Sequence, residues 1–496
     1  MRRAVVVAAG QSASSMGEFL AGILLVRLLA PADWAKLALA LTIYGTASGI
    51  GGLNVQDGIY YFYARVEAAR RVGLALQTMA VLFASALVIG AVLLLIGPWL
   101  QSRENEILPL IPWIALTVVL ELPTSCATQL LVSAERPHWA SIFGVTMSVA
   151  KLALMALPLL LGFPILAAAK GLALYALVRL SVCAVLLPIA LPKGRWVIDW
   201  PLLKEQIIYT APLTLAIGSA VLIKYIDKWI VVALVPNGFG IYAASAIEIP
   251  FIPLIGLSMG TVLATRISYA FQNGQPERAH GYWIAATTRV ALIVGPLTIG
   301  LILCAPEGFS LLFAPSYAAA IIPFQIFSVI ILHRVMAYGL ILRAAGATNA
   351  LWLASLFLLS LIVVFGFPLT YWLGLPGAAL GMVCAYALNL IFYLSCIAKV
   401  MKTNLVRVFP WRRYGAILLA AGASAVLALL AARPWASTWV RLLTKAGVFT
   451  SGYLILVSKV GLGRGLPLVP EDEPEFLESI AARNVAPVAT SAQPAA

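Results

Sequence analysis

Thirteen ionisable side chains lie inside long apolar stretches of the sequence, and they are its strongest candidates for chemistry. Eight are cationic: Lys151, Lys170, Arg179, Lys224, Lys228, Arg289, Arg334 and Lys445. Five are acidic: Glu18, Asp57, Glu121, Asp227 and Glu248. In a membrane, exposing all of them to lipid would cost on the order of 30–45 kcal/mol, several times the stability of a typical protein. Most must therefore face a wet cavity, pair with one another or snorkel to the membrane surface.

Three of these groups share one predicted helix. Lys224 and Lys228 are four residues apart on one face, and Asp227 is three residues from Lys224, so it can pair with that lysine. A partly neutralised cationic face suits a pyrophosphate, which carries several charges and strong acceptor oxygens. Snorkelling is the alternative for the cations near helix ends: Lys170, Lys228 and Arg289. Interhelical pairing is the alternative for the groups near helix midpoints: Glu18, Glu121, Lys151, Arg179, Glu248 and Arg334.

The composition indicates which elements position these groups. Of the 496 residues, 62% are hydrophobic and 10% charged, and the mean hydropathy is +0.99. This excludes a soluble globular domain, a disordered chain and a disulfide scaffold. Because a helix needs about 20 residues to cross the hydrocarbon core, the sequence predicts an all-α polytopic membrane protein of about fourteen transmembrane helices: 5–28, 37–62, 74–97, 107–132, 138–161, 164–190, 206–233, 239–263, 283–304, 318–342, 350–373, 376–398, 414–432 and 437–459.

The positions of Lys and Arg predict the orientation of these helices. With a cytoplasmic N-terminus, twenty of them fall on the cytoplasmic side and five on the other, so both termini are predicted to be cytoplasmic. The net charge of +14 is then mostly a matter of topology, and no nucleic-acid partner is needed to explain it. The predicted divisions are an N-terminal six-helix lobe (1–190), a cytoplasmic linker (191–205), a C-terminal six-helix lobe (206–398), two extra transmembrane helices (399–460) and a largely disordered cytoplasmic tail (461–496).

Comparison of the chain with itself indicates an internal repeat. The segment from Leu29 to Ala38 aligns with Leu234 to Ala243 at an offset of 205 residues, and 161–164 aligns with 373–376 at an offset of 212. The weaker match of 131–134 with 342–345 has an offset of 211. Since six helices separate the copies, both enter the membrane in the same direction. Parallel repeats of this kind are a transporter architecture, with the substrate site between the halves and alternating access by rocking.

Distinctive sequence patterns lie at the ends of predicted helices 1 and 7: the segment from Gly22 to Trp34, 225–229 and Gly240-Ile241-Tyr242. In these patterns the sequence resembles the multidrug/oligosaccharidyl-lipid/polysaccharide (MOP) exporter superfamily, and in particular its Wzx-type polysaccharide flippases. The resemblance extends over about residues 5 to 460. The first half departs from the pattern, with Ala35-Lys36-Leu37 where the second has Gly-Ile-Tyr. The resemblance implies two MOP-like, V-shaped lobes plus two appended helices.

The resemblance also implies a function, the flipping of polyprenyl-pyrophosphate-linked oligosaccharides across a bacterial cytoplasmic (inner) membrane for O-antigen, capsule or exopolysaccharide synthesis. No enzymatic activity, cofactor or metal is expected, while a polysaccharide polymerase and a chain-length regulator are expected partners. The predicted substrate-binding residues are Arg27, Asn54, Gln56, Lys224, Lys228 and Arg334. The predicted residues for coupling to H⁺ or Na⁺ are Glu18, Asp227 and Glu248, because a buried carboxylate can exchange an ion as the site opens. For Asn54 and Gln56 the alternative is a helix end near the cytoplasmic interface.

Two other functions remain open at this stage. A MATE-like cation or drug antiporter would use the same fold but prefers an acidic cavity, whereas here eight intramembrane cations face five acids. An integral-membrane polysaccharide polymerase or ligase usually carries catalytic residues on a sizeable external loop. The longest external loop predicted here spans about a dozen residues around Glu307-Gly308-Phe309 and has no His or Asp. The charge pattern therefore favours the flippase.

Overall fold

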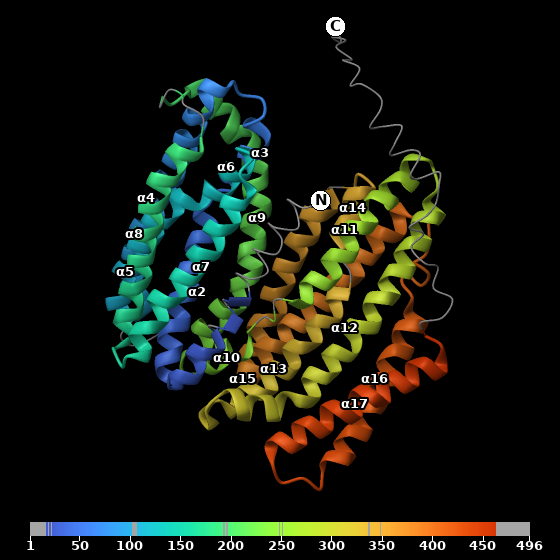
Figure 1. The fold of residues 1–496 in the computed structure, drawn as a ribbon. Helices are drawn as coiled ribbons and strands as arrows, with labels where there is room; N and C mark the ends of the chain where they lie inside the picture. Colours follow the sequence, from blue (N-terminus) through green and yellow to red (C-terminus); the bar gives the residue numbers. More distant parts are fainter. Residues whose placement is uncertain are drawn as a thin grey trace.

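The protein folds into two helical lobes, as the computed structural model in Figure 1 shows. The structure describes residues 16–462 except 18, 21, 102–106, 192–193, 195–196, 248, 250, 336–337 and 348. Throughout this part of the chain the regular elements are α-helices and short 3₁₀ helices, and there is no strand. The predicted all-α polytopic fold class is thus confirmed.

The first lobe contains seven labelled helices: α2 (Pro31–Gly51), α3 (Gly58–Phe62), α4 (Arg71–Gln101), α5 (Ile111–Glu121), α6 (Ala127–Ser133), α7 (Pro137–Leu160) and α8 (Ile165–Ala190). Two predicted helices are interrupted here. The helix predicted over 37–62 breaks after Gly51, where Leu53 and Asn54 adopt left-handed conformations with φ of 47° and 49°. The helix predicted over 107–132 passes through a 3₁₀ segment, Leu122–Cys126, between α5 and α6.

The second lobe has the same organisation. Its helices are α9 (Trp200–Leu234), α10 (Phe239–Ser245), α11 (Phe251–Gln272), α12 (Pro276–Leu312), α13 (Ile321–Ser328), α14 (Tyr338–Ala344) and α15 (Asn349–Val400). The element α15 contains two of the predicted spans, because the chain bends at Gly374, whose φ of 63° favours glycine. A 3₁₀ segment, Val329–Val335, follows α13 and interrupts the helix predicted over 318–342.

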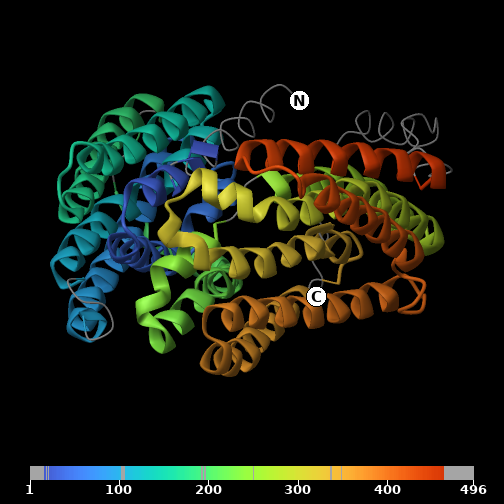
Figure 2. The ribbon, with the colours of Figure 1, turned by 90° about the horizontal axis from the view of Figure 1, so that it is seen from below.

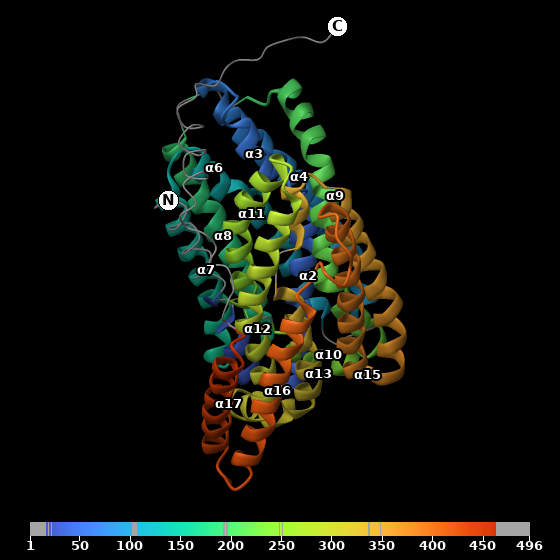
Figure 3. The same ribbon diagram turned by 90° about the vertical axis from the view of Figure 1, so that its right-hand side faces the viewer.

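Two further helices, α16 (Trp411–Ala432) and α17 (Thr438–Val460), form a hairpin that packs on α12. Figure 2 shows this hairpin beside the second lobe, and Figure 3 shows its tip projecting beyond the two lobes. A buried ion pair joins it to the lobe: the Lys445 ammonium lies 2.8 Å from both carboxylate oxygens of Glu307. Because α12 continues to Leu312, Glu307 lies inside a helix, and the prediction of an external loop around it is wrong.

Ten helices of the described chain are long and apolar enough to cross a membrane. The sequence predicted about fourteen, and the difference has identifiable causes. The first predicted span lies mostly outside the described residues, and the second and eighth are each broken into shorter helices. The eleventh and twelfth are joined in α15. The chain is therefore a multi-pass membrane protein whose helices are less regular than their apolar content suggests.

The lobes meet at one end and diverge at the other (Figure 1). At the closed end, which carries the turns at Pro31, Pro236 and Pro315, the Tyr317 hydroxyl donates to the Leu29 carbonyl at 3.1 Å. A Cβ on Gly240 would collide there with the Pro31 carbonyl, so only glycine allows α10 to approach α2 this closely. At the open end, which carries the α3–α4, α6–α7 and α11–α12 turns, the ribbons of the two lobes separate.

Helix α9 belongs to both lobes. Its first turns lie on the first lobe, where the fully buried Gln206 amide donates to Thr78 Oγ1 at 2.8 Å and accepts from Gln77 at 3.0 Å. Farther along, the Trp229 indole donates to Thr46 at 3.2 Å, and the end of α9 packs on α15. The predicted linker 191–205 is thus partly helical, since α9 begins at Trp200.

Candidate functional site

A cavity of about 450 Å³ lies in the second lobe, on the side where Phe19 and Gly22 contact it. Four elements of the lobe supply its walls: α9, the break between α10 and α11, the segment that leads from α13 into its 3₁₀ continuation, and the second half of α15. The described residues that line it are Phe19, Gly22, Ile223, Lys224, Tyr225, Asp227, Lys228, Ser245, Ala246, Ile247, Ile249, Ile252, Phe324, Phe327, Ser328, Ile330, Ile331, Arg334, Met382 and Tyr386.

The cavity lies where two helices are interrupted. Helix α13 ends at Ser328 and continues as a 3₁₀ segment in which Arg334 leaves helical geometry, with φ of −83° and ψ of 19°. Helix α10 ends at Ser245, and α11 begins only at Phe251. Irregular backbone at membrane depth is stable only where it is buried in protein or lines a wet cavity, and discontinuous helices form the binding sites of many transporters. The breaks therefore indicate a binding site.

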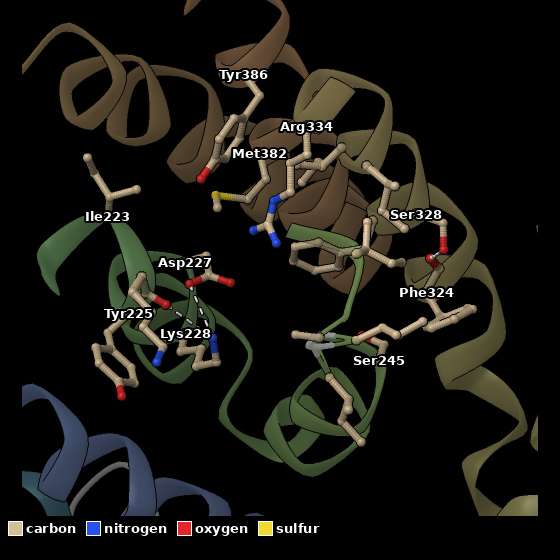
Figure 4. Close-up of a pocket in the computed structure, with 18 of the residues that line it drawn as sticks. Ile223, Tyr225, Asp227, Lys228, Ser245, Phe324, Ser328, Arg334, Met382 and Tyr386 are labelled. Atoms are coloured by element: carbon tan, nitrogen blue, oxygen red, sulfur yellow. Dashed lines mark hydrogen bonds and ion pairs between the residues drawn. The ribbon is translucent and has the colours of Figure 1, made fainter. Parts of the chain in front are cut away.

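Asp227 is the acidic centre of this cavity. Its carboxylate is 4% exposed and accepts a hydrogen bond from the Tyr242 hydroxyl at 2.9 Å. It also lies 3.7 Å from the Lys228 ammonium (Figure 4). The sequence suggested a pair with Lys224 instead. A lysine that precedes its acid along a helix is the less favourable order, and here the carboxylate is directed to Tyr242 on α10. The Lys228 ammonium also donates to the Lys224 carbonyl at 3.2 Å, which holds it beside Asp227.

The cavity has an excess of positive charge. Lys224, Lys228 and Arg334 face one carboxylate, Asp227, among the described lining residues. Figure 4 shows the Arg334 guanidinium reaching from the opposite wall toward Asp227. Lys224 is exposed on α9 near the Tyr225 ring, with its ammonium 5.5 Å from the ring centroid. Such a site suits an anion that carries more than one negative charge.

The structure brings together four of the predicted site residues and separates others. Lys224, Lys228, Asp227 and Arg334 line the cavity. Three other predicted residues are not among the described residues that line it. Arg27 is exposed, whereas Asn54 is buried and Gln56 half-buried after the break that follows α2. Glu18 and Glu248 lie outside the described residues. Their roles stay predictions.

A second charged cluster occupies the interior of the first lobe. The Glu121 carboxylate accepts hydrogen bonds from the hydroxyls of Tyr44 and Tyr175, and the Arg179 guanidinium lies 3.6 Å from it. The Lys151 ammonium donates to Tyr44 at 3.0 Å. These groups thus pair with one another across α2, α5, α7 and α8, which was the alternative interpretation of their charges.

Two positions of this first-lobe cluster have counterparts beside the cavity of the second lobe. His333 follows Glu121 by 212 residues and Tyr386 follows Tyr175 by 211, within the range of offsets found in the sequence. The His333 and Tyr386 rings also contact each other, with centroids 5.2 Å apart. The 3₁₀ segments Leu122–Cys126 and Val329–Val335 are similarly matched. The repeat offset, applied to Glu121 and Tyr175, would have identified this correspondence from the sequence.

Comparison with known proteins identifies solved structures that share this fold. No protein-family model and no curated protein matches the sequence. Among solved structures, the lipid II flippase MurJ in an inward closed conformation superposes with a TM-score of 0.69 at 12% identity, over 92% of this chain and 98% of that one. An inward-facing multidrug resistance MATE family transporter of the MOP superfamily superposes with a TM-score of 0.63 at 16% identity, over 79% and 96%. This chain shares the fold of these two structures.

A third MOP structure, a transporter from Pyrococcus furiosus described as having a binding pocket of reverse polarity, superposes with a TM-score of 0.53 at 15% identity, over 81% of this chain and 96% of that one. At these identities the likeness establishes the fold alone. The MurJ and MATE structures are described as inward closed and inward-facing, respectively. In this chain the two lobes pack together at the closed end and diverge at the open end.

Proposed function

We propose that this protein is a membrane transporter of the MOP superfamily that flips polyprenyl-pyrophosphate-linked oligosaccharide across the bacterial cytoplasmic membrane by alternating access. The observation that carries this proposal is the cavity beside the interrupted helices, whose described lining residues include three cations and one carboxylate. Lys224 and Arg334 bind the pyrophosphate, and Lys228 holds Asp227 in place through their ion pair. The Wzx-type branch, the role in surface polysaccharide synthesis and the polymerase and chain-length regulator as partners belong to the same proposal.

The orientation of the protein in the membrane is proposed from the basic residues at the open end. The open end carries Arg65, Arg71 and Arg136, which the distribution of basic residues assigns to the cytoplasm. Both termini are then cytoplasmic, and the structure is in an inward-facing state. In this state the pyrophosphate headgroup enters from the cytoplasm, while the polyprenyl chain stays in the bilayer.

A cation or drug antiporter is the second candidate, because one structural neighbour is a multidrug resistance transporter. The charge of the cavity opposes this, since a cationic substrate would meet Lys224, Lys228 and Arg334, and Asp227 is the one acid among the described lining residues. A polymerase or ligase is further disfavoured by the length of α12. Only Phe313 and Ala314 separate that helix from the next 3₁₀ element, so the external loop is even shorter than the sequence predicted.

Deletion of the gene in its host distinguishes these functions, with lipid-linked oligosaccharide then quantified in each leaflet. The flippase predicts that finished units accumulate on the cytoplasmic face and that surface glycan is lost. Unchanged lipid-linked sugars with new sensitivity to cationic drugs would instead identify an antiporter. Units stranded on the outer face would identify a polymerase or ligase.

Substitution of Asp227 tests whether flipping is coupled to an ion gradient. Its Oδ1 atom is buried and accepts no hydrogen bond from the described residues, so the carboxylate can take up a proton or Na⁺ when the cavity changes its access. An imposed potential of about 60 mV is worth about 1.4 kcal/mol for each coupled ion, so it should accelerate wild-type flipping by up to about tenfold, and Asp227→Asn should remove that acceleration. The measurement is initial flipping rate in proteoliposomes with and without a proton or Na⁺ gradient.

Asp33→Asn is the matched control, because Asp33 lies at the start of α2 and pairs with Lys36 at 3.8 Å, outside the cavity. This variant should keep the full response to the gradient. If Asp227→Asn responds as strongly as the wild type, Asp227 has no part in coupling.

A further inference from the structure

A second cavity, of about 740 Å³, lies at the open end of the first lobe and is separate from the substrate site. It is enclosed by the end of α3, the start of α4, the α6–α7 turn and the end of α8. Arg71 and Arg136 project from two of these elements, Tyr63 and Ser133 add hydroxyl groups, and Leu191 closes one side. The cavity is therefore polar and cationic, although it lies at the end of membrane-spanning helices.

Neither arginine in this cavity is neutralised by an acid of the described chain. The Arg71 guanidinium lies 4.7 Å from the centroid of the Tyr63 ring, and its Nε donates to the Val66 carbonyl at 3.4 Å. The Arg136 guanidinium lies 4.7 Å from the Trp139 ring centroid. No described carboxylate forms a salt bridge with either one. The neighbouring Arg70 differs, because it pairs with Asp199.

The two cations line the same cavity, and the Arg71 guanidinium lies over the Tyr63 ring. Burial raises the pKa of Tyr63, and the positive charges of Arg71 and Arg136 oppose this effect. Glu135 is the single acid among the described lining residues, and its side chain is exposed. Its backbone has φ of 60°, a left-handed conformation that is uncommon for a non-glycine residue, and Arg136 follows as the N-cap of α7. Two cations in one cavity, neither paired with a described acid, suit a phosphate group.

The surroundings of the cavity are those of a membrane surface. Next to it, Ile142 on α7 and Ile189 on α8 are 65% and 59% exposed. In the apolar 18-residue stretch of α7, 22% is buried inside the protein, so most of this helix faces lipid. Trp139, which the Arg136 guanidinium covers, is 38% exposed in the first turn of α7, at the level where tryptophan is enriched in membrane proteins. Acyl chains can therefore lie along α7 and α8 directly below the cationic groups.

We propose that this cavity is a binding site for the headgroup of an anionic phospholipid of the cytoplasmic leaflet. The phosphate oxygens accept hydrogen bonds from Arg71 and Arg136, whose planar guanidinium groups suit bidentate binding, and from the hydroxyl of Tyr63 or Ser133. Basic pockets between helices on the cytoplasmic side are a general means of binding such lipids. The bound lipid joins the α3–α4 and α6–α7 turns and steadies the open end of the first lobe.

Native mass spectrometry of the purified full-length protein, titrated with phosphatidylglycerol or with phosphatidylcholine, tests this proposal. We expect a tight phosphatidylglycerol site in the wild type, and an affinity for it about 10- to 30-fold lower in Arg71→Gln/Arg136→Gln. Arg65→Gln is the matched control, because Arg65 is exposed on the same turn, covers the Tyr61 ring at 3.4 Å and does not line the cavity. This control should bind phosphatidylglycerol as the wild type does.

A charge-retaining variant and a competition with inorganic phosphate distinguish a lipid site from a folding defect or a soluble phosphate site. Arg71→Lys/Arg136→Lys retains the charge and should recover part of the affinity, which shows that any loss in the glutamine variant is not a folding defect. Inorganic phosphate, added at the lipid concentration, should not displace phosphatidylglycerol; equal displacement would mean a soluble phosphate site and would overturn the proposal. Unchanged lipid binding in the glutamine variant, or equal binding of phosphatidylcholine, would overturn it as well.

Discussion

Replacing Lys224 with alanine is expected to lower the rate of oligosaccharide flipping about 10- to 150-fold, because a hydrogen bond between charged groups contributes about 1.5–3 kcal/mol. Lys224 is exposed in the cavity, and its ammonium forms no ion pair with the described residues. Its charge is therefore available to a substrate and is not needed for folding. The measurements are complementation of a flippase deletion strain, together with the amount of protein in the membrane.

Lys204→Ala is the matched control for Lys224→Ala. Lys204 is an exposed lysine on the same helix, five turns earlier, and does not line the cavity. It should complement fully. Full complementation by Lys224→Ala, at normal membrane levels, would show that the substrate site has been misplaced even if the protein is a flippase.

Replacing Lys445 with methionine should destabilise the protein by about 3–5 kcal/mol, because it leaves the buried Glu307 carboxylate without its partner. The two side chains are 8% and 5% exposed, and the Lys445 ammonium also donates to the Leu303 carbonyl at 3.3 Å. The change should therefore loosen the α16–α17 hairpin from α12. The measurement is the midpoint of thermal unfolding in detergent, with a decrease on the order of 10 °C.

Two further variants show whether that loss comes from the ion pair. Glu307→Leu/Lys445→Met removes both charges, and the buried pair should then be replaceable at little cost. Lys459→Ala removes an exposed lysine from the same helix α17 and should change stability by no more than about 0.5 kcal/mol. If Lys445→Met is as stable as Lys459→Ala, the hairpin is held by apolar packing alone.

The sequence predicts the fold well because a membrane imposes simple rules. Length, apolar content and charge distribution suffice to predict a polytopic all-α protein. The repeat offset also anticipates the internal symmetry, since Leu122–Cys126 and Val329–Val335 break equivalent helices. The Gly240-Ile241-Tyr242 motif has a clear structural basis: Gly240 allows contact with Pro31, and Tyr242 donates to Asp227.

The sequence did not predict the helix breaks or the partners of buried charges. Apolar content stays high across a break, so hydropathy does not reveal that Arg334 leaves helical geometry. Pro306 and Glu307 resemble a loop in sequence, yet they lie within α12, because Lys445, 138 residues away, satisfies the carboxylate. Pairing over such a distance depends on tertiary packing. The same is true of Asp227, whose orientation is set by Tyr242 on another helix.

Flipping by purified protein tests the central claim most directly. The protein is reconstituted into vesicles with a fluorescent polyprenyl-pyrophosphate oligosaccharide, and the fraction of label accessible from outside is followed over time, beside uptake of a cationic dye. We predict rapid flipping of the pyrophosphate-linked lipid, slow flipping by Lys224→Ala, and no uptake of the dye. Dye uptake with no movement of the lipid would contradict the assignment of the cationic cavity to a pyrophosphate substrate.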